Sequence, residues 1–353
     1  MNPLLASPQP AIIVGVDAHK DTHHVVVITA TGSRLGDQEF SATTKGYRQL
    51  LEWAESFGCI DKIGMESTGS YSAALTRFLI DAGKEVREVN TPHPHTRARK
   101  GKDDAIDAEA AARKVLAGEA TAIPKTTTGM VESIRLLSVA RDSAVKTRSI
   151  ALLQLQSILI TAPTEIREQI TAKTGRAQAA RCTKFRPDTA HLDDPVQAAK
   201  MALRTLAQRI YFLDEEVSTP DSQLQLLVSA TAPTLVSRLG IGTGHAAQFL
   251  VTAGQNVDRL RSEAAFARLC GAAPIPVSSG KTHRMRLHRG GDRQANRALH
   301  MIAVGRLRYD PRTIEYMQRR ITDGLSKKDV LRCLKRFIAR EVFNDLKTDI
   351  GLT

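Results

Sequence analysis

The stretch that decides the fold is Ala11-Ile-Ile-Val-Gly-Val-Asp-Ala-His-Lys-Asp-Thr-His-His-Val-Val-Val-Ile-Thr-Ala30. It holds two short runs rich in β-branched residues with a polar turn between them, and the second run closes at Thr31-Gly32. This pattern predicts two neighbouring strands joined as a hairpin. The first run ends at Asp17, so the predicted strand carries an acid at its end.

The residues that follow this hairpin alternate between helical and strand patterns. The predicted elements are a helix over 43–57, a strand over 61–65, a helix over 71–82, a strand over 84–89 and a helix starting near residue 104. Alternation of this kind is typical of an α/β domain. Glu66 ends the strand over 61–65, and α/β sheets place ligands at the edge where their strands end.

The segment from Lys100 to Arg113 begins as a basic stretch and continues as an Ala-rich helix. Asp104 and Asp107 are three residues apart, so on a helix their carboxylates project from one face. Two adjacent carboxylates resist ionising together unless a positive charge lies between them, and a divalent metal ion is the simplest such charge. The alternative is a solvated acidic first turn that complements the helix dipole.

Four acids could converge on one site in this domain. Asp17, Glu66, Asp104 and Asp107 offer hard oxygen ligands, which suit Mg²⁺ or Mn²⁺ better than zinc. Two such ions about 4 Å apart stabilise the attacking and leaving oxygens in phosphodiester chemistry. Five histidines of this region could ligate a metal, but they lack a matched ligand spacing, so polar contacts near the sheet edge are expected of them instead: His19, His23, His24, His93 and His95.

The second half of the chain has mainly helical patterns. Helical periodicity over 130–159 and again over 196–217, with a polar break between them, predicts an antiparallel hairpin or an interprotomer coiled coil. The predicted domains are residues 1–125, 126–225 and 226–353. A Pro- and Gly-bounded loop is expected over 271–280, followed by a basic loop over 281–293.

Charge is distributed unevenly along the chain. The formal net charge is +13, and residues 259–340 hold 20 Lys or Arg against 6 Asp or Glu, so the excess lies entirely in this quarter. A concentrated basic surface predicts a face that binds a polyanion, most commonly nucleic acid. Aromatic residues make up only 4% of the chain, so base stacking on single strands is disfavoured and contacts to duplex and backbone are expected.

Several classes of protein are disfavoured by composition. The cysteines lie far apart, without CxxC spacing, at Cys59, Cys182, Cys270 and Cys333. This pattern argues against zinc and favours a reducing compartment. Residues 1–10 lack the pattern of a signal peptide, and no apolar run approaches the length of a membrane span. A cytoplasmic protein with no membrane partner is therefore expected.

The doublet Ser278-Ser279, before Gly280, stands directly ahead of several cations, the first of which is Lys281. A serine needs activation to act as a nucleophile, and neighbouring cations stabilise negative charge that develops on a phosphoryl group. The residues alone leave open the alternative of a loop serine without a chemical role.

Four short motifs occur in one order along the chain: Val14-Gly-Val-Asp17-Ala-His-Lys20, Met65-Glu66-Ser-Thr-Gly69, Lys102-Asp-Asp104-Ala-Ile-Asp107-Ala and Pro274-Ile-Pro-Val-Ser-Ser279-Gly280. With them the chain resembles, from about residue 11 to 345, the DEDD insertion-sequence transposases. That family includes Piv/MooV-like invertases and bridge-RNA-guided serine recombinases. The resemblance implies a RuvC-like (RNase H-like) α/β N-terminal domain, a long helical coiled-coil-like connector and a mainly α C-terminal transposase domain.

The resemblance also implies residue roles. Asp17, Glu66, Asp104 and Asp107 would bind Mg²⁺ or Mn²⁺, and Ser279 would attack the DNA phosphodiester and form a transient phosphoserine link. Asp103 precedes Asp104 and Ser278 precedes Ser279, so each of these roles has a second candidate one residue earlier. The alignment with the family's motifs favours the second residue of each pair. The basic residues expected to contact DNA or RNA are Arg97, Arg99, Lys100, Lys102, Lys281, Arg284, Arg286, Arg289 and Arg293.

The function implied by the resemblance is that of a transposase or site-specific recombinase of a bacterial insertion sequence. It would cut and exchange strands of donor and target double-stranded DNA as a dimer or tetramer, guided by a noncoding bridge RNA and associated with the nucleoid during action. Two alternatives remain. One is a RuvC-like endonuclease for Holliday junctions that uses the acids and water, and the other is a non-catalytic nucleic-acid-binding regulator, against which the presence of all four acids argues.

Overall fold

The computed structural model describes residues 10–66, 68–89, 103–280 and 282–351. Two compact units make up the chain. The N-terminal unit comprises Met1–Thr128 together with the segment Ala253–Arg261, and the helical unit comprises Gly129–Thr252 and Ser262–Thr353. The predicted domain boundaries at residues 125 and 225 stay predictions.

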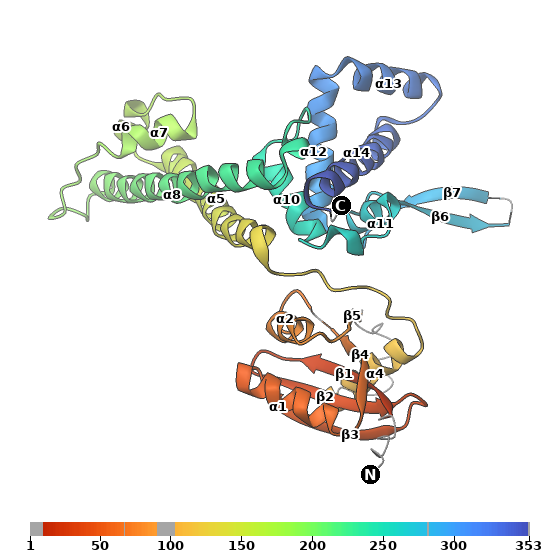
Figure 1. Cartoon of the computed structure of the whole chain (residues 1–353). Coiled ribbons are helices and arrows are strands. Elements are labelled where there is room, and N and C mark those ends of the chain that lie inside the picture. The colour runs from red at the N-terminus through yellow and green to blue at the C-terminus, as the bar shows by residue number, and fades with distance from the viewer. Residues whose placement is uncertain (1–9, 67, 90–102, 281, 352–353) are drawn as a thin grey trace, which may run out of the picture. The chain divides into compact units, whose positions relative to one another are not determined.

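The N-terminal unit contains a five-stranded sheet with helices on both faces (Figure 1). Its elements are β1 (Ala11–Ala18), β2 (Thr22–Thr29), β3 (Arg34–Ser41), α1 (Thr44–Glu55), β4 (Cys59–Met65), α2 (Ala73–Asp81), β5 (Val86–Glu88) and α4 (Asp104–Leu116). The strand order is β3-β2-β1-β4-β5. The pairs β1–β2 and β2–β3 are antiparallel, whereas β1–β4 and β4–β5 are parallel. This mixed sheet is consistent with the predicted RuvC-like (RNase H-like) domain.

Strand alternation gives the sheet two apolar faces. Val14 and Val16 of β1 face α1 and α2 on one side, where Leu50 and Leu79 complete the core. Ile13 lies on the other side, where it packs against the small buried alanines of α4. Because successive side chains of a strand point to opposite faces, Asp17 lies on the α4 side of β1.

Strand β3 was not predicted. Its sequence Arg34-Leu-Gly-Asp-Gln-Glu-Phe-Ser41 is mostly polar, and Phe40 is its one buried side chain. An edge strand with one solvated face needs few apolar residues, so it lacks the pattern by which inner strands are found.

The helical unit is built around two long helices and a C-terminal group of shorter ones. Its elements are α5 (Gly129–Thr161), α6 (Thr164–Gln169), α7 (Gly175–Cys182), α8 (Pro195–Thr231), α9 (Pro233–Val236), α10 (Thr243–Ala253), α11 (Glu263–Leu269), β6 (Pro274–Ser279), β7 (Thr282–Leu287), α12 (Arg293–Tyr309), α13 (Pro311–Thr322) and α14 (Lys327–Ile350). Among the described residues, no helix combines the length and the apolar character needed to cross a membrane.

Helices α5 and α8 pack antiparallel. Arg148 near the middle of α5 contacts Asp214 with 2.6 Å between Nη1 and Oδ1, whereas Arg141, earlier in α5, contacts Asp221, later in α8, at 2.5 Å. An antiparallel helical hairpin, one of the two predicted arrangements, is thereby confirmed, and an interprotomer coiled coil stays a prediction. Helix α8 continues past its predicted end and through Pro220, because buried residues of its last turns hold it in place.

The prediction of a loop over 271–280 is wrong, and so is the prediction of a loop for the first part of 281–293, because both regions contain strands. Strands β6 and β7 form an antiparallel hairpin that projects from the helices of this unit (Figure 1). Pro274 and Pro276 suggested a loop because proline cannot donate a backbone hydrogen bond. A two-stranded ribbon consists only of edge strands, however, and these tolerate proline.

Candidate functional site

Two of the predicted acids follow adjacent parallel strands. The register of β1 and β4 pairs Val16 with Met65, so Asp17 and Glu66 are the next residues along the two strands. Glu66 is buried, with 7% of its surface exposed. Its backbone carbonyl accepts a hydrogen bond from Ser72 Oγ at 2.7 Å, which anchors the segment after β4 to the start of α2. The sheet therefore brings these acids to one edge, as predicted from the strand ends.

Glycine in the same two strands allows α4 to approach the sheet closely. A Cβ on Gly15 would overlap the backbone carbonyl oxygen of Ala108 and lie 2.6 Å from the backbone nitrogen of Ala112. A Cβ on Gly64 would lie 2.7 Å from the carbonyl oxygen of Ala111. Each glycine stands two residues before an acid and therefore on the same face of its strand. The backbone of α4 thus rests directly on the face that carries Asp17.

Asp103 and Asp104, at the N-terminus of α4, have different roles. Asp103 is the N-cap, and its Oδ1 accepts a hydrogen bond from the backbone nitrogen of Ala105 at 3.0 Å. Such a cap satisfies one of the free N–H groups at a helix start. Asp104 is the first residue of the helix, and its carboxylate lies in a cluster with residues of β1 and the turn after it. This geometry favours Asp104, rather than Asp103, as the acid of the site.

Three side chains form this cluster: Asp17, His19 and Asp104. Their nearest ligand atoms all lie within 4.8 Å of one another. His19 Nε2 is 4.0 Å from Asp17 Oδ2 and 3.7 Å from Asp104 Oδ1. Asp17 is mostly buried, with 16% of its side chain exposed, whereas His19 and Asp104 are 40% and 42% exposed. Two carboxylates and an imidazole at these separations are a donor set that fits a divalent ion such as Mn²⁺ or Mg²⁺.

Glu66 and Asp107 lie outside this group of three. Asp107 is half-buried in the first turn of α4, three residues after Asp104. Its backbone nitrogen donates to the carbonyl of Asp103 at 3.0 Å, so the first turn that carries both acids is regular. The structure therefore places Asp17 and Asp104 in one cluster with His19, which was expected to make a polar contact, and places Glu66 at the end of the strand beside that of Asp17.

Ser279 lies at the tip of the β6–β7 hairpin. It pairs with Thr282 and is followed by Gly280, whose φ of +55° permits the turn. Ser278 and Ser279 are both exposed, and strand alternation places them on opposite faces of the ribbon. Ser279 shares its face with Ile275 and Val277, which are half-buried. The two serines that the sequence left ambiguous thus differ in the face from which they project.

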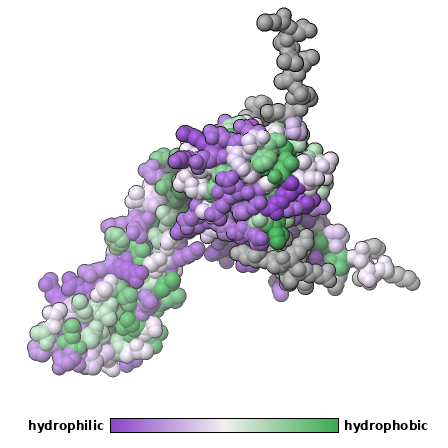
Figure 2. Space-filling view, turned by 90° about the horizontal axis from the view of Figure 1, so that it is seen from below, coloured by the Kyte–Doolittle hydropathy of each residue, from purple (hydrophilic) through white to green (hydrophobic). Residues whose placement is uncertain are grey.

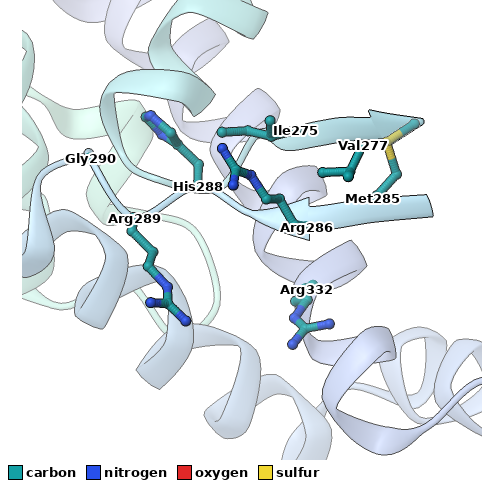
Figure 3. Close-up of a pocket in the computed structure, with 8 residues that line it drawn as sticks. All are labelled: Ile275, Val277, Met285, Arg286, His288, Arg289, Gly290 and Arg332. Atoms are coloured by element: carbon teal, nitrogen blue, oxygen red, sulfur yellow. The ribbon is translucent and has the colours of Figure 1, made fainter. Parts of the chain in front are cut away.

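A cationic cavity adjoins the hairpin (Figure 3). It has a volume of about 880 Å³ and is lined by Ile275, Val277, Met285, Arg286, His288, Arg289, Gly290 and Arg332. Ile275 and Val277 lie on the face of β6 that also carries Ser279. The arginines come from β7, from the segment after it and from α14. Such a cavity suits a phosphate backbone, because guanidinium groups donate paired hydrogen bonds to phosphate oxygens.

Comparison with known families matches both halves of the chain. A family model described as a transposase matches residues 14–162, and a model of the IS116/IS110/IS902 transposase family matches residues 232–318. The chain belongs to the IS110 family of DEDD transposases. The resemblance that the sequence motifs suggested is therefore confirmed.

Two curated proteins are similar to this IS110-family chain. It is 27% identical over 143 residues to the insertion element IS900 uncharacterized 42 kDa protein of Mycobacterium paratuberculosis, an alignment covering 40% of this chain and 36% of that protein. It is 31% identical over 135 residues to the insertion element IS110 uncharacterized 43.6 kDa protein of Streptomyces coelicolor, covering 37% of this chain and 33% of that one. The chain thus spans about a third of the length of each relative.

The predicted basic residues of the IS110-family chain fall into two groups. Arg286 and Arg289 line the cavity beside the serine hairpin, and Arg293 is the first residue of α12. The others lie outside the described residues: Arg97, Arg99, Lys100, Lys102, Lys281 and the side chain of Arg284.

His19 was weighed as a metal ligand but expected to make a polar contact, whereas Arg332 in the cavity was not predicted at all. The signal for His19 was its place two residues after Asp17. Arg332 lies on a distant helix, and its position in the sequence carries no such signal.

Proposed function

We propose that this protein is the transposase of an insertion sequence and that it cuts and rejoins DNA strands. One observation carries the proposal: in a chain whose two halves match transposase families, Asp17 and Asp104 converge at the edge of the sheet. The serine hairpin and its cationic cavity support the same function, because they combine a nucleophile with groups that hold phosphates.

The acid cluster is the proposed binding site for Mg²⁺ or Mn²⁺. Asp17, Asp104 and the neighbouring Glu66 and Asp107 would hold the ion, and a bound ion would stabilise negative charge on the oxygens around the phosphorus. The residues themselves fix the geometry. Strand β1 holds Asp17, while the Asp103 cap and the close packing of α4 on Gly15 hold Asp104 against it.

Ser279 is the proposed nucleophile. Its Oγ forms a bond to the phosphorus of a DNA phosphodiester while the bond from phosphorus to one deoxyribose oxygen breaks. The serine hydroxyl gives up its proton and the released deoxyribose oxygen takes one up, so atoms and charge balance. The phosphoserine diester conserves the energy of the broken bond. A hydroxyl of another strand can then reverse the step, which exchanges strands instead of leaving free ends.

The proposed partners are double-stranded donor and target DNA, a noncoding guide RNA and further copies of the chain. The cationic cavity, lined in part by the hairpin that carries Ser279, supports contacts to a nucleic-acid backbone. The guide RNA follows from the family resemblance alone.

Exposed apolar side chains on α5 support the assembly of several copies of the chain. In Figure 2 the arm formed by α5 to α8, at the lower left, shows hydrophobic patches (green) among hydrophilic ones (purple). On α5 these side chains lie at heptad spacing, interrupted by Ser143, Lys146 and Ser157: Leu136, Val139, Ile150, Leu153 and Ile160.

A trapping experiment with matched variants tests this function. The purified chain, together with RNA transcribed from the ends of its own element, is incubated with Mn²⁺ and duplex DNA carrying those ends, and covalent protein–DNA adducts are measured after denaturation. Adducts are expected for the native chain and for Ser278→Ala, but none for Ser279→Ala. Asp104→Asn should lower strand transfer by about a hundredfold or more, because loss of a charged ligand removes several kcal/mol of charge stabilisation. Asp103→Asn should have little effect, since asparagine also caps helices.

The alternatives give different outcomes. Full strand transfer by Ser279→Ala, without any adduct, would overturn the role of the serine. Free DNA ends that depend on Asp17 and Asp104 but not on Ser279 would indicate a RuvC-like endonuclease. A native chain that binds DNA but neither cuts it nor binds Mn²⁺ would indicate a non-catalytic regulator.

A further inference from the structure

Three histidines follow Asp17 within seven residues, and the structure gives each a different environment. His23 is fully buried and stacks on Tyr47 with 5.7 Å between ring centroids. His24 Nε2 hydrogen-bonds Asp37 Oδ2 at 2.9 Å. His19 alone of the three directs a ring nitrogen at the acid cluster, where it lies near both Asp17 and Asp104.

The turn between β1 and β2 places His19 in this position. The backbone nitrogen of His19 donates to the carbonyl of Thr22 at 2.9 Å, which closes the turn directly after Asp17. The imidazole is thereby held beside the carboxylates of Asp17 on β1 and Asp104 on α4. Because the turn is short and anchored at both ends by paired strands, this placement does not depend on a long flexible loop.

We propose that His19 is a direct metal ligand, which makes the centre a mixed nitrogen and oxygen site. The inference rests on the proposed function, since it concerns the ion of the same acid cluster. For an octahedral ion with bonds of about 2.0–2.1 Å, adjacent ligand atoms lie about 3 Å apart and opposite ones about 4 Å apart. His19 Nε2 lies 3.7 Å from Asp104 Oδ1 and 4.0 Å from Asp17 Oδ2, no farther than opposite ligand atoms, so all three side chains are close enough to share one ion.

A nitrogen ligand has a consequence for the choice of metal. Mg²⁺ prefers carboxylate oxygens and water, whereas imidazole is a ligand for transition metals. His19 therefore raises the affinity for Mn²⁺ relative to Mg²⁺. The partial exposure of His19 and Asp104 leaves room for water or a phosphate oxygen at the remaining positions of the ion. The metal centre thus prefers Mn²⁺ over Mg²⁺ more strongly than four carboxylates would.

The test measures the bound metal directly. The full-length chain is loaded with MnCl₂, and pulsed electron paramagnetic resonance records coupling between Mn²⁺ and a ligand nitrogen. Native protein and the control His24→Gln should both show nitrogen coupling, and His19→Gln should lack it while still binding Mn²⁺. Its Mn²⁺ affinity should fall by about tenfold or more, since even residues that only orient ligands are worth that much. Its Mg²⁺ affinity, measured by competition, should change less.

Labelling all histidines with ¹⁵N gives a second measurement that does not depend on a variant. If a histidine is the ligand, the coupling of Mn²⁺ to ¹⁴N in the unlabelled native protein should be replaced by coupling to ¹⁵N in the labelled protein. Nitrogen coupling that is absent from native Mn²⁺-loaded protein, or that survives in His19→Gln, would overturn the inference and leave the proposed function standing. Mn²⁺ that fails to bind the native chain, or that binds Asp104→Asn equally well, would instead overturn the metal site of the proposed function.

Discussion

Single residues decide how closely α4 approaches the sheet, and Gly15 is the clearest case. Gly15→Ala would place a Cβ against backbone atoms of Ala108 and Ala112, which cannot move without moving the helix. Overpacking of this kind costs about 1–3 kcal/mol or more. We expect a lower thermal unfolding midpoint, and also weaker Mn²⁺ binding, because Asp104 moves away from Asp17. Thermal unfolding and Mn²⁺ titration measure the two effects.

Gly69→Ala is the matched control for this substitution, since a Cβ on Gly69 meets no atom of the described residues within 4 Å. Its unfolding midpoint should remain close to that of the native chain. Equal midpoints for Gly15→Ala and Gly69→Ala would contradict the close contact between α4 and β1.

Among the elements, α5 presents two different faces. Leu155 is fully buried in a core shared with α6, α7 and α8, whereas Leu153 is 66% exposed. Leu155→Ala should lower the free energy of unfolding by about 2–5 kcal/mol, because it leaves a cavity. Leu153→Ala should change it by less than about 0.5 kcal/mol, as exposed substitutions usually do. Urea unfolding of the two variants, at equal low protein concentration, compares these effects.

The exposed face of α5 also makes a prediction about assembly. Leu153→Asp places a charge in the heptad stripe, so sedimentation should show a smaller species than the native chain if this stripe joins protomers. An unchanged mass would exclude the stripe as an interface. A stability loss for Leu153→Ala as large as that for Leu155→Ala would contradict the packing of α5.

At the scale of the whole molecule, a segment from the C-terminal half belongs to the N-terminal unit. Asn256 Oδ1 accepts from the backbone nitrogen of Thr126 at 3.0 Å, and its Nδ2 donates to the carbonyl of Pro124 at 3.0 Å. Arg259 lies in the same segment, where burial lowers the pKa of its guanidinium and Glu88 opposes that shift. This later segment is therefore hydrogen-bonded to residues 124 and 126, near the end of the first part of the N-terminal unit.

Asn256→Ala tests these hydrogen bonds. It removes the acceptor for Thr126, so the amide of Thr126 should exchange with deuterium about fivefold faster, because a hydrogen bond contributes on the order of 1 kcal/mol. Asn256→Asp keeps the acceptor and should preserve the slow exchange. Native protection of Thr126 in Asn256→Ala would show that the segment is held without this side chain.

Part of this molecule could be predicted from local sequence patterns. The inner strands and most helices, the positions of Asp17 and Glu66 at strand ends and the basic C-terminal quarter all follow from periodicity and composition, which act between near neighbours. An α/β sheet followed by a mostly helical region was predicted and is confirmed. The order of the motifs predicted the transposase family, which the comparisons confirm.

Contacts between distant segments were decided only by the tertiary structure. Polar β3 became a strand because β2 offered its edge, and the residues around Ser279 became a hairpin through cross-strand pairing. His19 joined Asp104 because two glycines let α4 lie on the sheet. Periodicity reports which face of an element is buried, but which partner buries it depends on shape and on hydrogen bonds formed across the fold.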